Sequence, residues 1–169
     1  MSLLTHSDKV MTIRTAPSIA HGDEWLSIGA IPSCRLIELP KIPDARGNLT
    51  FLEGSRHIPF AIKRVYWIYD VPGGETRGGH ALKTQSEVLI AISGSFQVVL
   101  DDGQRRESVL LNRSYFGLYI PPMTWRHIEE FSTNSLCLIL SSAQYEEADY
   151  IREHHAFKRR KESDHDNNR

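Results

Sequence analysis

Short runs of β-forming residues, each bounded by turn-forming residues, fill most of this sequence and constrain its fold more than any other feature. The runs expected to be strands are Arg35–Glu38, Asn48–Glu53, Val65–Asp70, Glu87–Ser93, Ser95–Leu100, Ser108–Leu111, Tyr115–Ile120 and Ser135–Ser141. Segments such as Ser93-Gly94-Ser95 and Asp101-Asp102-Gly103 separate them with residues that tolerate turn dihedral angles. Many short strands joined by tight turns are typical of a sandwich or a barrel.

The run Ser95–Leu100 indicates how such a strand packs. Phe96, Val98 and Leu100 occupy every second position, and a period of two places them on one face of a strand. We therefore expect that face to point into a core. One jelly-roll-like barrel, with its functional site in the barrel mouth, accounts for these runs without a second domain.

The two ends of the chain differ from its centre. Residues 1–32 mix polar, small and charged residues without periodicity, which predicts an irregular N-terminal leader. Residues 33–157 are expected to form the barrel and one short terminal helix, because Ser141-Ser142 can cap a helix and Tyr145, Ala148 and Ile151 recur at near-helical spacing. Residues 158–169 are expected to be a charged, flexible tail. The predicted fold class is all-β, with one barrel and a C-terminal helix.

Length and net charge limit the number of domains and the classes of partner that this chain can have. A chain of 169 residues fits one domain of the usual ~100–200 residues. A net charge of −1 does not produce the basic field that binds nucleic acid, so no such partner is expected. The sequence contains neither a secretory signal nor an apolar stretch of the ~20 residues that span a membrane, which predicts a cytoplasmic protein without a membrane partner.

Two segments contain the spacing of a known site. Gly74 to Gly94 follows the pattern G-x5-H-x-H-x4-E-x6-G, with His80 and Glu87 in place and Leu82 at the second histidine position. The segment Pro122-Met123-Thr124-Trp125-Arg126-His127 follows P-x-G-x-x-H, with threonine for the glycine. On a strand, residues two apart point to the same face, so this spacing builds a site from neighbouring strands. The two segments resemble the two motifs of the cupin superfamily.

Three of the four usual cupin metal ligands are thus present, as His80, Glu87 and His127. Two histidines and one carboxylate are a ligand set for iron, manganese or zinc. One hypothesis is therefore a metal-dependent cupin enzyme, although no metal or other cofactor is assumed.

A wider resemblance covers residues 33–152. It is to the WxcM-like sugar isomerases, the cupin branch of dTDP-4-keto-6-deoxyhexose 3,4-ketoisomerases. The blocks that resemble this family are Pro43-Asp44-Ala45-Arg46-Gly47, Lys63-Arg64-Val65-Tyr66, Arg77-Gly78-Gly79-His80-Ala81, Ser93-Gly94-Ser95, Asp101-Asp102-Gly103, Ile120-Pro121-Pro122 and Asp149-Tyr150-Ile151-Arg152.

The resemblance implies an intramolecular oxidoreductase. Such an enzyme moves the keto group of a dTDP-linked 4-keto-6-deoxyhexose from C4 to C3 through an enediol, generally without metal, in 3-amino-sugar biosynthesis. It also implies a homodimer, commonly with exchange of an N-terminal strand.

The same resemblance assigns roles to residues. His80 matches the first family histidine, and a neutral imidazole suits proton transfer because its ordinary pKa is ~6.5. Tyr66 is the second candidate catalytic residue, through its hydroxyl group. Arg77, Lys83 and Arg64 are expected to bind the anionic part of the substrate.

Leu82 replaces the second family histidine, and leucine cannot transfer a proton. His80 could perform both transfers, or Tyr66 or His127 could replace the missing group. The activity could also have changed, which leaves a non-catalytic sugar-nucleotide-binding cupin as a further hypothesis.

Overall fold

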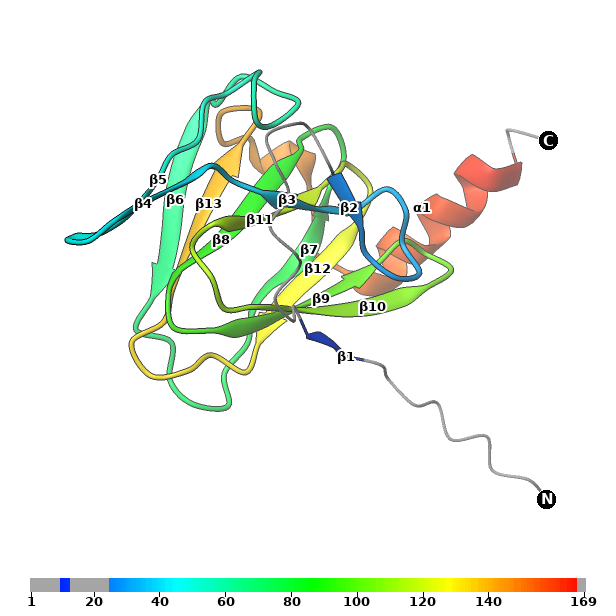
Figure 1. Ribbon diagram of the computed structural model, residues 1–169. Coiled ribbons are helices and arrows are strands. Elements are labelled where there is room, and N and C mark those ends of the chain that lie inside the picture. Colours follow the sequence, from blue (N-terminus) through cyan, green and yellow to red (C-terminus); the bar gives the residue numbers. More distant parts are fainter. Residues whose placement is uncertain (1–9, 13–24, 167–169) are drawn as a thin grey trace.

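The computed structural model describes residues 10–12 and 25–166, and two six-stranded sheets make up its body (Figure 1). The first sheet has the order β1 (Val10–Thr12), β10 (Arg106–Leu111), β9 (Phe96–Asp101), β12 (Trp125–Glu129), β7 (Arg77–Leu82) and β14 (Tyr150–Ile151). The second has the order β2 (Trp25–Ser27), β3 (Arg35–Glu38), β11 (Phe116–Ile120), β8 (Glu87–Ser93), β13 (Leu136–Ser141) and β6 (Arg64–Tyr69). The prediction of an all-β fold with one short C-terminal helix is confirmed.

Residues from both sheets meet in one apolar core. Phe96, Val98 and Leu100 of β9 are fully buried there, as their alternation predicts, and they face residues such as Leu89 and Ile139 of the other sheet. Strands β9 and β10 pair as an antiparallel hairpin, so the Asp101-Asp102-Gly103 segment is the expected turn. Alternation therefore determines which side chains can line the interior.

The helix lies further along the chain than the sequence indicated. α1 covers His154–Asp166, whereas the segment before it contains a 3-10 turn, η1 (Glu147–Asp149), and then β14. Tyr150 and Ile151 pair with Leu82 and Ala81 of β7, which satisfies backbone groups that would otherwise lie on an open sheet edge. This long-range pairing overrides the near-helical spacing of the segment.

α1 is anchored to the barrel by Phe157 and Asp101. The Phe157 side chain is fully buried against Ala81 and Trp125, and Asp101 accepts hydrogen bonds from Lys158 Nζ and, through its other oxygen, from His154 Nε2, each at 3.0 Å. Residues 158–166 are therefore helical, where a flexible tail was expected. Most of the expected leader, residues 1–9 and 13–24, lies outside the described residues, and β1 and β2 are the strands that the described part contains.

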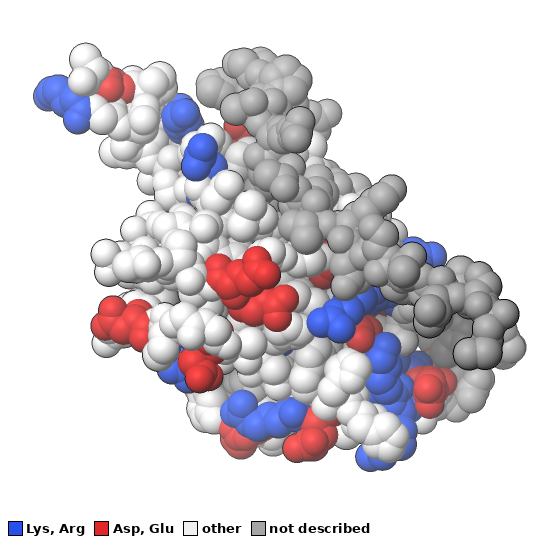
Figure 2. All heavy atoms as spheres, turned by 90° about the horizontal axis from the view of Figure 1, so that it is seen from below, with Lys and Arg blue, Asp and Glu red and all other residues white. Residues whose placement is uncertain are grey.

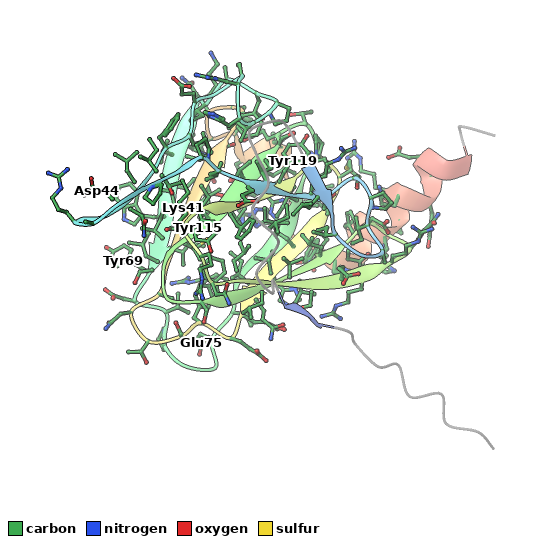
Figure 3. The ribbon with its side chains drawn as sticks, in the orientation of Figure 1. Lys41, Asp44, Tyr69, Glu75, Tyr115 and Tyr119 are labelled. Carbon is green, nitrogen blue, oxygen red and sulfur yellow. The ribbon has the colours of Figure 1, made fainter. Side chains whose placement is uncertain are left out.

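The hairpin of β4 (Lys41–Asp44) and β5 (Gly47–Thr50) projects from the barrel (Figures 1 and 3). Its strands pair with each other and with no other strand in the described residues. Figure 3 shows Asp44 at the tip, while Lys41 lies near the body, where its ammonium group is 4.7 Å from the centre of the Tyr115 ring. A two-stranded hairpin of this kind is marginally stable without further support.

Acidic and basic side chains are interspersed over the face of the molecule shown in Figure 2, without one broad basic area among the coloured residues.

No helix in the described part of the chain is long and apolar enough to cross a membrane.

Candidate active site

A cavity of about 210 Å³ lies inside the barrel, and strands of both sheets contribute to its wall. Its lining residues are Tyr66, Ile68, Gly78, His80, Glu87, Leu89, Arg126, Ile128, Ile139 and Arg152. Half of them are apolar or small, and the other half are the polar or charged residues Tyr66, His80, Glu87, Arg126 and Arg152. A few placed polar groups in an apolar cavity are the usual composition of a binding or catalytic site.

His80 is the central polar group of this cavity. It lies on β7 directly opposite Arg126 of β12, and its Nε2 is buried with no hydrogen-bond partner in the described residues. Burial, and then the positive charge of Arg126, lower the pKa of His80 to about 4. The imidazole is therefore neutral at pH 7, and its unpartnered nitrogen is available to accept a proton.

The backbone before His80 requires glycine. Gly78 and Gly79 have φ angles of 85° and 67°, in the left-handed region, and a Cβ on Gly78 would be 3.2 Å from the Arg126 carbonyl oxygen. The register between β7 and β12 shifts at this point, between Arg126 and His127. The bulge thus brings the two strands close together beside His80.

Tyr66 and Glu87 form a hydrogen-bonded pair across the cavity. The Tyr66 hydroxyl donates to Glu87 Oε1 at 2.7 Å. Burial, together with the adjacent negative charge of Glu87, raises the pKa of Tyr66, so the phenol keeps its proton at neutral pH. Tyr66 is therefore a proton donor within the same cavity as the neutral base.

Arg126 is the site residue that sequence reasoning missed. Its side chain is buried and donates to Glu87 Oε2, and both side chains of this pair are less than 5% exposed. Burial alone would raise the pKa of Glu87, but the Arg126 charge and the hydrogen bonds from Tyr66 and Arg126 hold that pKa below its ordinary value. The cavity thus contains an ionised carboxylate paired with a guanidinium group.

His127 does not join this cluster, which corrects its place in the metal hypothesis. Along β12, Arg126 and Ile128 line the cavity, so the residue between them faces the other side, where its Nε2 lies 3.1 Å from Glu129 Oε2. His80, Glu87 and His127 are therefore not assembled as a ligand set. Within residues 10–12 and 25–166, no group of three or more His, Cys, Asp or Glu side chains is arranged to hold a metal ion.

The three predicted anion-binding residues occupy different places. Arg64 lies next to the cavity, with one guanidinium nitrogen 3.3 Å from the Tyr150 hydroxyl and 3.5 Å from Glu87 Oε1. Arg77 is exposed and pairs in register with Ile128, which places it at the cavity edge. Lys83 donates to the carbonyl oxygen of Ala148 in the turn before β14, so it does not line the cavity.

Leu82 is buried two residues after His80, at 1% exposure. The residue paired with it in β14 is Tyr150, whose ring centre is 4.8 Å from that of His80. The position of the second family histidine is thus an apolar position in this chain. His80 is therefore the neutral base of the cavity with an unpartnered nitrogen in the described residues.

The arrangement suits proton abstraction next to a carbonyl group. A neutral base, a protonated phenol and a buried guanidinium line one small cavity, and the guanidinium group can stabilise negative charge on oxygen. Low polarity around them strengthens each interaction.

Comparison with known proteins points to the same chemistry. Residues 32–162 match the family model described as FdtA: WxcM-like, C-terminal. TDP-4-oxo-6-deoxy-alpha-D-glucose-3,4-oxoisomerase from Aneurinibacillus thermoaerophilus is 42% identical over 125 residues, which are 74% of this chain and 90% of that protein.

Solved structures agree. A 3,4-ketoisomerase from Helicobacter canadensis superposes with a TM-score of 0.74 at 40% identity, over 76% of this chain and 97% of its own. A histidine-to-asparagine variant of the QdtA 3,4-ketoisomerase from Thermoanaerobacterium thermosaccharolyticum, in complex with TDP-4-keto-6-deoxyglucose, has a TM-score of 0.77 at 36% identity, over 79% and 96% of the two chains. The predicted cupin type of barrel is thereby confirmed.

Proposed function

The chain belongs to the WxcM-like family of TDP-sugar 3,4-ketoisomerases, and we propose that it moves the keto group of a TDP-4-keto-6-deoxyhexose from C4 to C3 with His80 as the base. The resemblance expected from the sequence is confirmed at the level of the family. The observation that carries the assignment of the base is the buried, unpartnered Nε2 of His80, held neutral beside Arg126.

The proposed reaction needs no external oxidant or reductant. Nε2 of His80 accepts the proton from C3, which the neighbouring C4 keto group acidifies, and an enediolate forms between C3 and C4. Arg126, whose guanidinium group has further N–H donors besides the one on Glu87, stabilises the charge on the oxygen at C4. The imidazolium then returns a proton to C4, the hydroxyl proton on the C3 oxygen passes through solvent to the oxygen at C4, and the product has a keto group at C3 and a hydroxyl group at C4.

His80 performs both carbon-centred transfers in this proposal, because Leu82 can perform neither. One base suffices when C3 and C4 are adjacent, since the same imidazolium reaches both carbons. The metal-dependent and the non-catalytic alternatives are not favoured, because the matched relatives are ketoisomerases and His127 faces away from His80. We expect the product to enter deoxysugar biosynthesis, as a precursor of 3-amino sugars.

The reaction is tested by its pH profile. With TDP-4-keto-6-deoxyglucose as substrate, kcat/KM should stay level between pH 7 and about 5 and fall as pH approaches about 4, because protonation of His80 then removes the base. Formation of the 3-keto product is followed by proton NMR, and circular dichroism checks that the fold survives at each pH. A kcat/KM that does not fall on acidification would contradict the role of His80 as the base, whereas a midpoint near 6.5, the ordinary histidine pKa, would contradict the lowered pKa alone.

A homodimer is part of the proposal, and it is supported by apolar surface next to the projecting hairpin. Val65, Trp67 and Tyr69 are about half-exposed on β6, an edge strand of its sheet, and Ile42 and Leu49 are similarly exposed on the hairpin. Figure 3 shows Tyr69 pointing away from the barrel. β1 and β2 pair within the chain, so we place the contact between the hairpin of one copy and β6 of the other instead of in an exchanged N-terminal strand.

Replacing Trp67 by glutamate should therefore shift the protein from dimer to monomer. Light scattering should give twice the 19.3 kDa chain mass for the unmodified protein, with dimerisation at least about 30-fold weaker in Trp67→Glu because a buried interface tryptophan contributes about 2 kcal/mol or more. Arg160→Glu, on the exposed face of α1, is the control and should remain dimeric. A monomeric unmodified protein would refute the proposal.

We also propose a cytoplasmic location. Cys34 and Cys137 are buried free thiols, as is usual for proteins of reducing compartments.

A further inference from the structure

The cavity around His80 is too small for a whole nucleotide sugar. Its volume of about 210 Å³ lies below the ~300–1000 Å³ typical of sites that enclose drug-sized ligands. A hexose ring fits such a space, but the diphosphate and the nucleoside attached to it must then lie outside, at the cavity mouth. Any group that recognises the diphosphate should therefore both line the cavity and reach solvent.

Arg152 meets both conditions. It lines the cavity, and its side chain is 50% exposed. Its guanidinium carbon lies 4.5 Å from the centre of the Tyr150 ring, which packs in turn against His80. The positive charge of Arg152 is also among the causes that lower the pKa of His80, after burial and Arg126. The two groups are thus close enough to act on one substrate.

The guanidinium group of Arg152 is already engaged by a carboxylate. Nε and NH2 of Arg152 donate to the two oxygens of Glu147, each at 2.8 Å, in a fork that a phosphate group can also accept. Glu147 belongs to the turn η1, and its Oε2 also accepts from the Tyr145 hydroxyl. The side chain of Glu147 is 58% exposed, so both partners of this ion pair are in contact with solvent.

We propose that Arg152 binds the diphosphate of the nucleotide-sugar substrate and that Glu147 occupies its guanidinium group until that diphosphate displaces it. The inference rests on the proposed function and extends it to the anion subsite. Solvent screens an exposed ion pair and leaves it weak, so a doubly charged diphosphate with more acceptor oxygens can replace the carboxylate. Glu147 therefore acts as an internal competitor that keeps the side chain of Arg152 in place and weakens substrate binding.

The test is calorimetric titration with TDP, the nucleoside diphosphate part of the substrate. Glu147→Gln removes the competing charge and should lower the Kd of TDP by about 3-fold to 5-fold. Arg152→Gln removes the binding group and should raise that Kd by about 10-fold or more. In the double variant, Glu147→Gln should not change the Kd of TDP further, because the guanidinium group for which Glu147 and TDP compete is absent.

Glu53→Gln is the matched control. Glu53 forms a similar exposed pair with Arg56, at 2.6 Å, on residues that do not line the cavity. Glu53→Gln removes the same unit of charge as Glu147→Gln and should leave the Kd of TDP unchanged. Unchanged or weaker TDP binding by Glu147→Gln would overturn the inference, as would Arg152→Gln with the Kd of the unmodified protein. Thermal unfolding of each variant checks that η1 and β14 remain folded.

Kinetics separate this inference from the proposed function. Because Arg152 contacts the diphosphate and not the reacting carbons, Arg152→Gln should raise KM for TDP-4-keto-6-deoxyglucose more than it lowers kcat. An unmodified protein that binds TDP but never forms the 3-keto product would refute the isomerase proposal alone. An active isomerase whose TDP affinity is insensitive to both substitutions would refute the role of Arg152 alone.

Discussion

Replacing His80 by asparagine is expected to lower kcat for the conversion of TDP-4-keto-6-deoxyglucose by about 100-fold to 10,000-fold, the usual contribution of a general base. Asparagine has a similar size and cannot accept a proton at neutral pH. Leu82 cannot accept a proton, and the Glu87 carboxylate is engaged by Tyr66 and Arg126, so neither is available to take the proton from carbon. Steady-state kinetics measure the loss, and an unchanged Kd for TDP shows that the site remains folded.

His127→Asn is the control for this substitution. His127 lies on the opposite face of β12 from Arg126, with Glu129 as its partner, so its loss should leave kcat within about 2-fold of the unmodified value. A large loss in His127→Asn with little loss in His80→Asn would mean that the wrong histidine has been assigned.

Replacing Arg126 by methionine should destabilise the fold by about 3–5 kcal/mol, the usual cost of leaving one charge of a buried pair without its partner. Glu87 is 1% exposed, and after the substitution the nearest remaining cation is one nitrogen of Arg64 at 3.5 Å. Chemical denaturation gives the free energy of unfolding. The same variant should lose activity, because Arg126 lines the cavity and is the group proposed to stabilise charge on the reacting oxygen.

The double variant Arg126→Met with Glu87→Gln distinguishes the buried charge from lost packing. Removing both charges should recover more than half of the lost stability, since neutral glutamine can still accept from Tyr66. If the double variant is as unstable as Arg126→Met alone, the loss of stability comes from packing, and the unpaired charge of Glu87 contributes little to it.

Alternation made part of this fold predictable. Phe96, Val98 and Leu100 face the core because strand side chains alternate, and the strand Glu87–Ser93 has the expected bounds because turn residues follow it. The segment before α1 was not predictable in this way. Tyr150 and Ile151 become a strand only through pairing with β7, some 70 residues earlier, and no local spacing records that contact.

The site was predictable to a similar degree. The motif spacing identified His80 and Glu87, and family resemblance added Tyr66, all of which line the cavity. The motif spacing also favoured His127. Alternation along Trp125–Glu129 offered a signal against it: if Ile128 faces the core, so does Arg126, and His127 between them faces away. Lys83 is not among the residues that line the cavity, and its side chain donates to the Ala148 carbonyl oxygen.

The pairing of Arg152 with Glu147 beside the cavity had no local signal in the sequence, although Arg152 belongs to one of the blocks that resemble the family. Glu147 and Arg152 are five residues apart in an irregular segment, and their relation to the cavity depends on where β14 pairs. The same holds for the small cavity volume, which results from two sheets packing together.

The central claim is that His80 carries the proton between C3 and C4 of the sugar, and proton NMR in deuterated water tests it most directly. The purified protein is incubated with TDP-4-keto-6-deoxyglucose, with a 3-aminotransferase present to trap the 3-keto product. The account predicts that, at early times, at least part of the hydrogen at C4 of the trapped product is protium transferred from C3, and that His80→Asn forms the product at least about 100-fold more slowly. Product formation by His80→Asn at the rate of the unmodified protein would contradict it, as would a C4 hydrogen that comes wholly from solvent.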